Sequence, residues 1–197
     1  HGARTVYARA VAVGAPVGDF TTAFDEVIKE DVQILVAPEL TTTQALTVLG
    51  ALVNSAETNG QDLLAVIGAD GASAALVAEQ ADDTPSDDRI ILCAPGYFVP
   101  NPATPDTDVE LPGNYMSAPV AALLSTLSPQ SSPTNKTLPG IARLARRFSY
   151  SERINLVTKR PLVRDLTRVT TMLSSSSQLG LQADVSRRFG PERRLGI

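Results

Sequence analysis

The sequence predicts an α/β fold with an open, mainly parallel sheet flanked by helices. Short, continuous apolar runs are typical of strands buried on both faces, and VQILVAP and RIILCAPGYF are two such runs. Between these runs lie amphipathic stretches with the period of an α-helix. Strand and helix alternate at short spacing, which favours parallel strands joined by right-handed crossovers. The 197 residues are enough for one core of ordinary size.

The first elements are predicted by the spacing of their apolar residues and by the capping and breaking residues at their ends. TVYARAVAV alternates and is rich in β-branched residues, so we expect a strand from Thr5 to Val13. After GAPVG, the stretch DFTTAFDEVIKE predicts a helix with Asp19 or Thr21 as its N-cap. VQILVAP predicts a buried strand that ends at Pro38. TTTQALTVLGALVNSAETNG then predicts a longer helix, capped by a Thr and stopped at Gly60.

The same alternation continues through the middle of the chain. LLAVIGAD predicts a strand, GASAALVAEQA a helix, and RIILCAPGYF another strand with an extended exit. A Pro/Asp-rich loop is expected from Val99 to Pro112. NYMSAPVAALLSTL predicts a helix that begins near Ala118, with Pro119 in its first turn. Farther along, ERINLV and QADVSRRF are predicted to be helical and LTRVTTML to be a strand.

Charge is distributed unevenly along the chain. Residues 1–140 hold 5 Lys or Arg and 17 Asp or Glu, a balance of −12, whereas residues 141–197 hold 12 and 4, a balance of +8. The basic part therefore predicts an acidic partner, either nucleic acid or an acidic protein surface. It has few aromatic residues to stack on bases and no helix-turn-helix or RNP pattern. No apolar run approaches the roughly 20 residues that cross a bilayer, and no leader is recognised at the N-terminus.

Catalytic chemistry has few candidates. His1 is the only histidine, so a Ser-His-Asp or Cys-His arrangement has no base within the sequence. GxSxG, GxxxxGK[ST] and GxGxxG patterns are all absent. Cys93 lies in an apolar run and is expected to be a small buried hydrophobe. We therefore expect no enzyme activity and no cofactor.

Three weaker signals leave alternatives open. The turn from Gly68 to Gly71 follows a strand and opens a helix, so it predicts either a phosphate cradle or a plain turn capped by Asp70. The first alternative would make the protein a small α/β enzyme or a nucleotide-binding module. The carboxylates of ADDTPSDD lie in a Pro/Ser loop that is expected to be solvated rather than metal-binding. Asn135-Lys136-Thr137 matches the weak glycosylation pattern N-x-[ST].

The order of features is more specific than any single motif. RIILCAPGY leads through a variable loop to ELPGNYMSAPVAALLSTLSPQSSPTNKTLPG, and this order resembles the core of contractile tail sheath proteins. Such proteins occur in myovirus-type phages, pyocin-like particles and related contractile injection systems. TNK is the most specific part of the match. The matching residues are Pro95, Gly96, Leu111, Pro112, Tyr115, Ala118, Val120, Ala121, Leu124, Pro129, Thr134, Asn135, Lys136 and Leu138.

The resemblance implies a structural subunit that stacks in rings around an inner tube and contracts to drive the tube through a target envelope. Its partners would be other copies of itself, the inner tube protein, the baseplate and the tail terminator, with no membrane and no specific nucleic acid. It would act in a virion tail or phage-tail-like particle assembled in the bacterial cytoplasm. Residues 1–140 would form the sheath core and residues 141–197 a basic, tube-facing part of that core. The family's insertion domain and terminal arms are expected to be missing or truncated here, so we expect a monomer or weak association in solution.

Two sets of residues are assigned to assembly. SSPTNKTLPG is interpreted as an architectural joint, because Pro133 and Pro139 restrict the backbone while Thr134, Asn135 and Thr137 satisfy exposed backbone groups. Lys136 within the joint is placed to reach an acidic surface. The second set is basic and is expected to face the tube, where the family's chain approaches it. Its members are Arg143, Arg146, Arg147, Arg153, Lys159 and Arg160, followed by Arg164 and Arg168.

Overall fold

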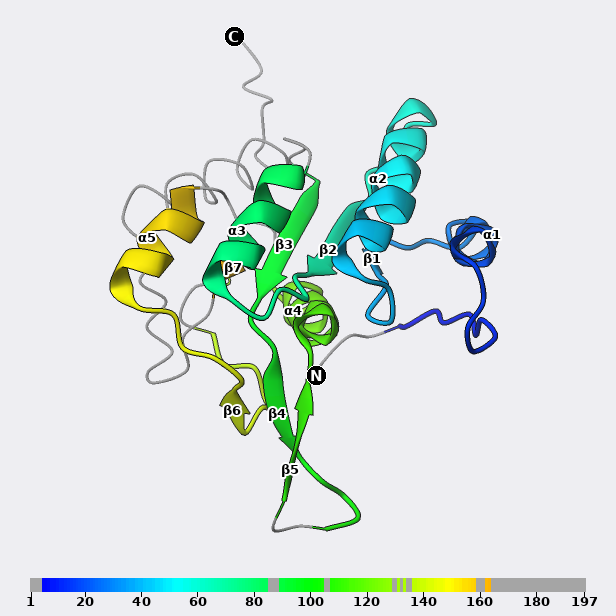
Figure 1. The fold of residues 1–197 in the computed structure, drawn as a ribbon. Helices are drawn as coiled ribbons and strands as arrows, with labels where there is room; N and C mark the ends of the chain where they lie inside the picture. Colours follow the sequence, from blue (N-terminus) through cyan, green and yellow to red (C-terminus); the bar gives the residue numbers. More distant parts are fainter. Residues whose placement is uncertain are drawn as a thin grey trace, which may run out of the picture.

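A four-stranded parallel sheet forms the centre of the protein (Figure 1). The structure is a computed structural model that describes residues 5–84, 89–104, 107–128, 131, 133, 136–158 and 162–163. The strands run in the order β1 (Ile34–Val36), β2 (Leu64–Gly68), β3 (Ile90–Ala94) and β7 (Leu162–Val163). Val66 pairs with Val36 on one side and with Ile91 on the other. The predicted mainly parallel α/β sheet is confirmed.

Helices cover both faces of this sheet. The helices are α1 (Val17–Val27), α2 (Thr42–Thr58), α3 (Ala74–Asp83), the 3₁₀ turn η1 (Gly113–Met116), α4 (Ser117–Leu124) and α5 (Tyr150–Thr158). Successive strand side chains point to opposite faces, so Ala65 and Ile67 of β2 pack into a core with α2, α3 and α5. Val66 points to the other face and packs with η1 and α4. The sheet is therefore buried on both faces, as its apolar strands predict.

Helix α2 follows its sequence signals closely. Thr41 is the N-cap, and its hydroxyl accepts a hydrogen bond from the Gln44 N–H at 3.4 Å while the Gln44 side chain accepts one from the Thr41 N–H at 3.2 Å. This reciprocal pair is a capping box. Gly60 adopts a φ of +74° just after the helix, a conformation that favours glycine. The predicted limits of this helix are confirmed.

A second, antiparallel sheet extends from the first. β4 (Tyr97–Pro100) lies between β5 (Asp108–Leu111) and β6 (Arg143–Leu144), and the β4–β5 hairpin projects away from the helices (Figure 1). The expected loop from Val99 to Pro112 is therefore wrong at both ends, where residues 99–100 and 108–111 belong to strands. Val99 pairs with Val109, and the Asn101 N–H donates to the Thr107 carbonyl at 2.9 Å. Pro and Asp gave a loop signal here because an exposed edge hairpin tolerates both residues.

The predicted strand from Thr5 to Val13 is also wrong. The segment has no strand partner in the part of the chain that the structure describes, and Val6 and Val13 are 76% and 107% exposed. Alternation and β-branching are not sufficient, because a strand also needs a neighbour with which to pair. Helix α1 begins at Val17 after Pro16, whose side chain forms no cap, so the predicted N-caps at Asp19 and Thr21 are wrong too.

Later predictions have mixed outcomes. α4 begins at Ser117, one residue before the expected start, and Pro119 lies in its first turn. α5 includes the predicted helical ERINLV. LTRVTTML and QADVSRRF lie outside the described residues. In the described part of the chain, no helix is long and apolar enough to span a bilayer.

Candidate assembly site

Three glycines allow close backbone contact where the central sheet, the β4–β5 hairpin and η1 meet. Gly68 ends β2, Gly96 lies between β3 and β4, and Gly113 begins η1. A Cβ at Gly68 would lie 2.5 Å from the Asn114 carbonyl oxygen, and one at Gly96 would lie 2.6 Å from the Leu111 oxygen. A Cβ at Gly113 would collide with the Ala69 carbonyl. Only glycine allows backbones this close, so we call Gly68, Gly96 and Gly113 the glycine junction.

The residues that carry the family resemblance surround this junction. Pro95 is buried and joined to Ala94 by a cis peptide bond. Leu138 is buried, and Leu111 and Tyr115 are partly buried, all in the cluster between the sheet and α4. Pro112 is exposed and precedes η1. Except for Pro112, which is at the surface, these residues hold the hairpin and the segment after α4 against the sheet.

Only part of the predicted joint is described. Pro133 is buried, and its carbonyl accepts a hydrogen bond from the Lys136 N–H at 3.4 Å. Lys136 and Thr137 are exposed. Leu138, which follows them, is buried and anchors the segment in the core. Thr134 and Asn135 lie outside the described residues. The described part therefore combines a turn with a buried anchor.

Cys93 and Tyr97 lie within the same cluster. Cys93 is fully buried, and its Sγ donates to the Ile67 carbonyl at 3.2 Å, which confirms its prediction as a buried residue. Burial raises the pKa of the Tyr97 hydroxyl, with a smaller contribution from the nearby Cys93. The Tyr97 hydroxyl is therefore neutral at pH 7 and acts in packing.

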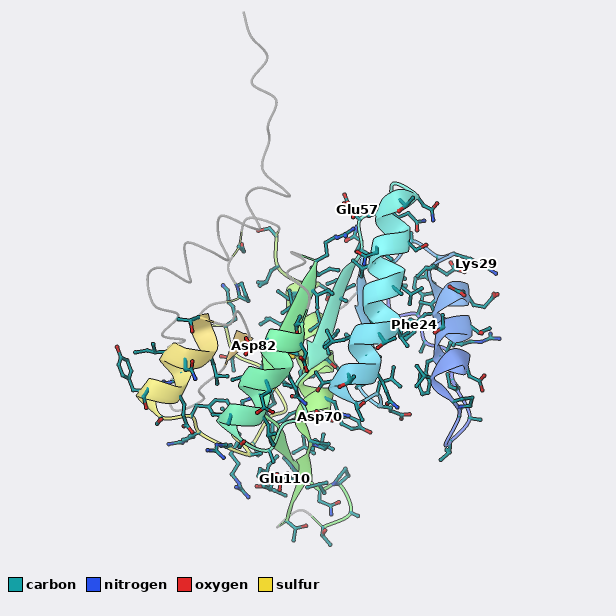
Figure 2. The ribbon with its side chains drawn as sticks, turned by 45° about the horizontal axis from the view of Figure 1, so that its top comes forward. Phe24, Lys29, Glu57, Asp70, Asp82 and Glu110 are labelled. Carbon is teal, nitrogen blue, oxygen red and sulfur yellow. The ribbon has the colours of Figure 1, made fainter. Side chains whose placement is uncertain are left out.

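Internal hydrogen bonds hold the Gly68–Gly71 turn at the end of β2. The Asp70 N–H donates to Thr42 Oγ1 at 2.9 Å, and the Gly71 N–H donates to Gln80 Oε1 at 3.1 Å. Gln80 also donates to the Asp70 carboxylate. Asp70 lies at the base of α2 and α3 (Figure 2). Because its carboxylate is engaged by both helices, it does not cap α3; Ser73 does, accepting from the Leu76 N–H at 3.2 Å.

This arrangement bears directly on ligand binding. A phosphate needs free amide donors at a helix N-terminus, and the Asp70 and Gly71 amides of the turn already have partners inside the protein. The backbone of Gly113 and Asn114 lies against Gly68, where a ligand would approach the strand end. The predicted cap at Asp70 is therefore wrong. Among the described residues, no three His, Cys, Asp or Glu side chains are grouped to hold a metal ion.

Arg143 ties β6 to the hairpin. Its guanidinium lies 3.6 Å from the centre of the Phe98 ring, and its Nε is 3.4 Å from Asp108 Oδ2. The three residues come from three adjacent strands, since Phe98 pairs with Arg143 on one side and β5 supplies Asp108. The Arg143 side chain remains 60% exposed. It therefore braces the hairpin and still presents charge to solvent.

Arg146 is held by the start of α5. Its Nη2 lies 3.1 Å from Glu152 Oε1, and its Nη1 donates to the Ala72 carbonyl at 3.4 Å. Glu152 also accepts a hydrogen bond from the Ser149 N–H at 2.7 Å, and the Ser149 hydroxyl accepts one from the Glu152 N–H. The Ser149 N–H and side chain, with a smaller effect of Arg146, lower the pKa of Glu152.

The other basic residues differ from these two. Arg147 is exposed and has no acidic partner in the described part of the chain. Arg153 is partly buried on α5. Lys159 and Arg160, with Arg164 and Arg168, lie outside the described residues. The acidic partners of Arg143 and Arg146 were not predicted, because Asp108 is 35 residues from its arginine and no sequence pattern links them.

Solved structures of sheath tail proteins have the same fold. The protein from Desulfitobacterium hafniense matches with a TM-score of 0.59 and 11% identity, over 89% of this chain and 42% of that one. The protein Lin1278 from Listeria innocua matches with a TM-score of 0.58 and 14% identity, over 75% of this chain and 30% of that one. The chain thus spans less than half the length of either protein. No family model and no curated protein matches the sequence. The resemblance found in the sequence is confirmed at the level of the fold.

Proposed function

We propose that the protein is a structural subunit of a contractile tail sheath, which assembles in stacked rings around an inner tube and contracts to drive the tube through a target envelope. The observation that carries this proposal is the fold shared with two sheath tail proteins at TM-scores of 0.59 and 0.58. Contraction requires two arrangements of the subunit interfaces with unequal free energy. The extended arrangement would be held by baseplate and tube contacts.

The strand ends favour this structural role over the alternative of a small enzyme or nucleotide-binding module. Open α/β sheets bind ligands beyond the carboxyl ends of their strands. Here the space above Gly68 is taken by the backbone of Gly113 and Asn114, and the turn amides bond to Thr42 and Gln80. The same feature that would bind a ligand in an enzyme instead connects the two sheets.

In this function the protein would act in a virion tail or a phage-tail-like particle assembled in the bacterial cytoplasm. Its partners would be other copies of itself, the inner tube protein, the baseplate and the tail terminator. Residues 1–140 would form the core, and residues 141–197 its basic, tube-facing part. Leu144 and Phe148 connect the two by packing into the two clusters on either side of the sheet.

Within the basic part, we assign contact with an acidic tube surface to Arg143 and Arg146. Their side chains are 60% and 42% exposed, and each is fixed by an internal carboxylate. Fixed side chains lose less entropy on binding than free ones. Exposed ion pairs contribute only about 0–1 kcal/mol each, so the tube contact would depend on many such pairs along the tail.

Electron microscopy of the native full-length protein tests the sheath function directly. We expect helical tubes or sleeves. Calorimetry against nucleotides and phosphorylated metabolites tests the alternative, and tight stoichiometric binding of any of them would overturn the sheath proposal.

Charge reversal tests the tube contact. We expect the variant Arg143→Glu/Arg146→Glu, made in the full-length protein, to give fewer sheaths on tubes and greater sensitivity to salt. The variant Asp108→Asn/Glu152→Gln is the matched control, because it breaks the same internal ion pairs and keeps both arginines. Normal assembly of the reversed variant would contradict the assignment. Equal loss in both variants would also contradict it, because the defect would then come from the broken internal pairs.

A further inference from the structure

The outward side of α5 exposes apolar surface. Leu156 is 1% exposed and points into the core, whereas Tyr150 and Ile154 are 67% and 48% exposed. These two residues are four positions apart, so they lie on the same side of the helix. Ser151 beside them is exposed and uncharged. We define the α5 face as Tyr150, Ile154 and the preceding Arg147.

The α5 face also carries uncompensated positive charge. Arg143 and Arg146 pair with Asp108 and Glu152, whereas Arg147 has no acidic partner among the described residues. Arg and Tyr are enriched among the residues that dominate protein–protein binding. A complementary surface would place carboxylates next to exposed apolar side chains.

The opposite end of the same protein has both exposed carboxylates and exposed apolar side chains. Along α1 and the turn after it, only Glu26 pairs with a base in the described structure, and that base is Lys29, which lies at the end of α1 in Figure 2. Val6 and Val13, in the segment before α1, are 76% and 107% exposed. We define the α1 end as these two valines and the exposed, unpaired acids of this region. The acids are Asp19, Asp25, Glu30 and Asp31.

The two surfaces lie at opposite ends of the molecule. In Figure 1, α1 lies beyond β1 and α5 lies on the side of β3 and β7, with the sheet between them. They therefore meet only between different copies. Because they are different surfaces, their contact is head-to-tail, and such contacts propagate into rings or open helices.

We propose that the α5 face of one copy binds the α1 end of a second copy. This inference rests on the proposed function, which requires each subunit to contact its neighbours. It assigns Arg147, which the sequence places in the tube-facing set, to a contact between copies instead. Charge contributes part of the attraction, so added salt weakens the contact. The apolar residues of both surfaces contribute a part that salt does not screen.

Two variants that each lack one surface test the proposal. Arg147→Ser/Ile154→Ser alters only the α5 face, and Asp19→Asn/Asp25→Asn/Glu30→Gln alters only the α1 end. We expect sedimentation velocity over a concentration series to show weak self-association of the wild type, and self-association at least about tenfold weaker again for each variant. An equal mixture of the two is expected to form a dimer that does not grow, because each variant retains the surface that the other lacks. Leu76→Ser, at an exposed position on α3, is the control and is expected to associate like wild type.

Several results would overturn the inference. They are a wild-type chain that does not associate, variants that associate like wild type, and a mixture that forms no dimer. A fourth is an α5-face variant that loses binding to purified inner tube protein while its self-association is unchanged, which would assign the face to the tube. Failure of the proposed function is seen separately by electron microscopy. Normal sheaths from both variants overturn only this inference, whereas wild-type chains that associate head-to-tail without forming sheaths overturn only the sheath function.

Discussion

At the scale of single residues, the glycine junction makes the strongest prediction. A methyl group at position 113 meets the Ala69 carbonyl, which belongs to the backbone and cannot rotate away. We expect Gly113→Ala to lower the free energy of unfolding by about 3 kcal/mol, measured by urea denaturation. The control is Gly18→Ala in α1, where an added Cβ meets nothing within 4 Å. Because alanine favours helix, that variant should be more stable by about 0.4–1 kcal/mol. A neutral Gly113→Ala would show that the junction is not tightly packed.

Arg89 supports a second prediction at this scale. It is 8% exposed, and its guanidinium donates to the Val53 carbonyl and to Asn54 Oδ1, both at 3.2 Å. It also lies 2.6 Å from Glu57, which is 65% exposed and is seen near the end of α2 in Figure 2. We expect Arg89→Met to lower the free energy of unfolding by about 2–3 kcal/mol in thermal or urea unfolding, because the buried Val53 carbonyl and the Asn54 side chain on α2 lose their donor.

The partner variant separates burial from charge in this site. Glu57→Gln removes only the exposed half of the ion pair, so it should cost less than about 1 kcal/mol. Equal losses for both variants would mean that the ion pair, not the buried hydrogen bonds, fixes α2 to β3.

Sequence patterns predicted single residues well where the effect is local. Thr41 is the cap of α2 because its partner is three residues away, and Cys93 is buried because its run is apolar. The prediction that Asp70 caps α3 was wrong because its partners, Thr42 and Gln80, come from two other elements. The glycine junction was missed for the same reason. Each glycine is unremarkable in sequence, and only the tertiary fold brings Gly68 and Gly113 together.

At the scale of elements, the start of α5 predicts a pH effect. The Ser149 N–H, the Ser149 side chain and Arg146 hold the pKa of Glu152 below its ordinary value of 4.5. A carboxyl with a lowered pKa stabilises the folded state above its ordinary pKa, and this stabilisation disappears as the pH falls through the folded value. Glu152→Gln should therefore lower the melting temperature at pH 7 and have progressively less effect below about pH 4.5.

The control for this effect is Glu79→Gln on α3. Glu79 is exposed, and its side chain forms no hydrogen bond or ion pair within the described residues. Its replacement should leave the melting temperature nearly unchanged at pH 7 and at pH 3. A difference between wild type and Glu152→Gln that stays constant from pH 7 to pH 3 would contradict the role of the ionised carboxylate.

Elements were predictable when their own sequence contains both an apolar pattern and residues that mark where the element begins and ends. Helix α2 has a cap, an apolar stripe and a terminal glycine, and its limits were found to within two residues. The hairpin residues Val99 and Val109 were assigned to a loop because their pairing is visible only once the chain folds back. Residues 5–13 show the opposite error, since the alternating pattern has no partner strand in the described structure.

At the scale of the whole molecule, the sheet unites two hydrophobic clusters. Leu49 of α2 belongs to the cluster on one face and Val120 of α4 to the cluster on the other, and both are fully buried. Because β2 contributes side chains to both clusters, loss of either should unfold the other. We expect Leu49→Ala and Val120→Ala to lower stability by about 2–5 and 1–3 kcal/mol, each in one transition by calorimetry.

Leu76→Ala on α3 is the control at this scale. Leu76 is 46% exposed, so its truncation should change stability by less than about 1 kcal/mol. Two separate heat-absorption peaks in either core variant would show that the clusters unfold independently. In that case the antiparallel sheet with α4 would be a unit distinct from the α2–α3 side.

The glycine junction also determines how mechanical load travels through the protein. The β4–β5 hairpin is connected to the rest of the protein at the junction. β4 continues the chain of β3 through Gly96, and β5 leads into η1 through Gly113. Where backbones touch with no side chain between them, the contact contains no flexible group to absorb a displacement. A force on the hairpin tip is therefore transmitted to the central sheet and rotates the protein as a whole. A small turn of the body likewise sweeps the tip through a larger arc.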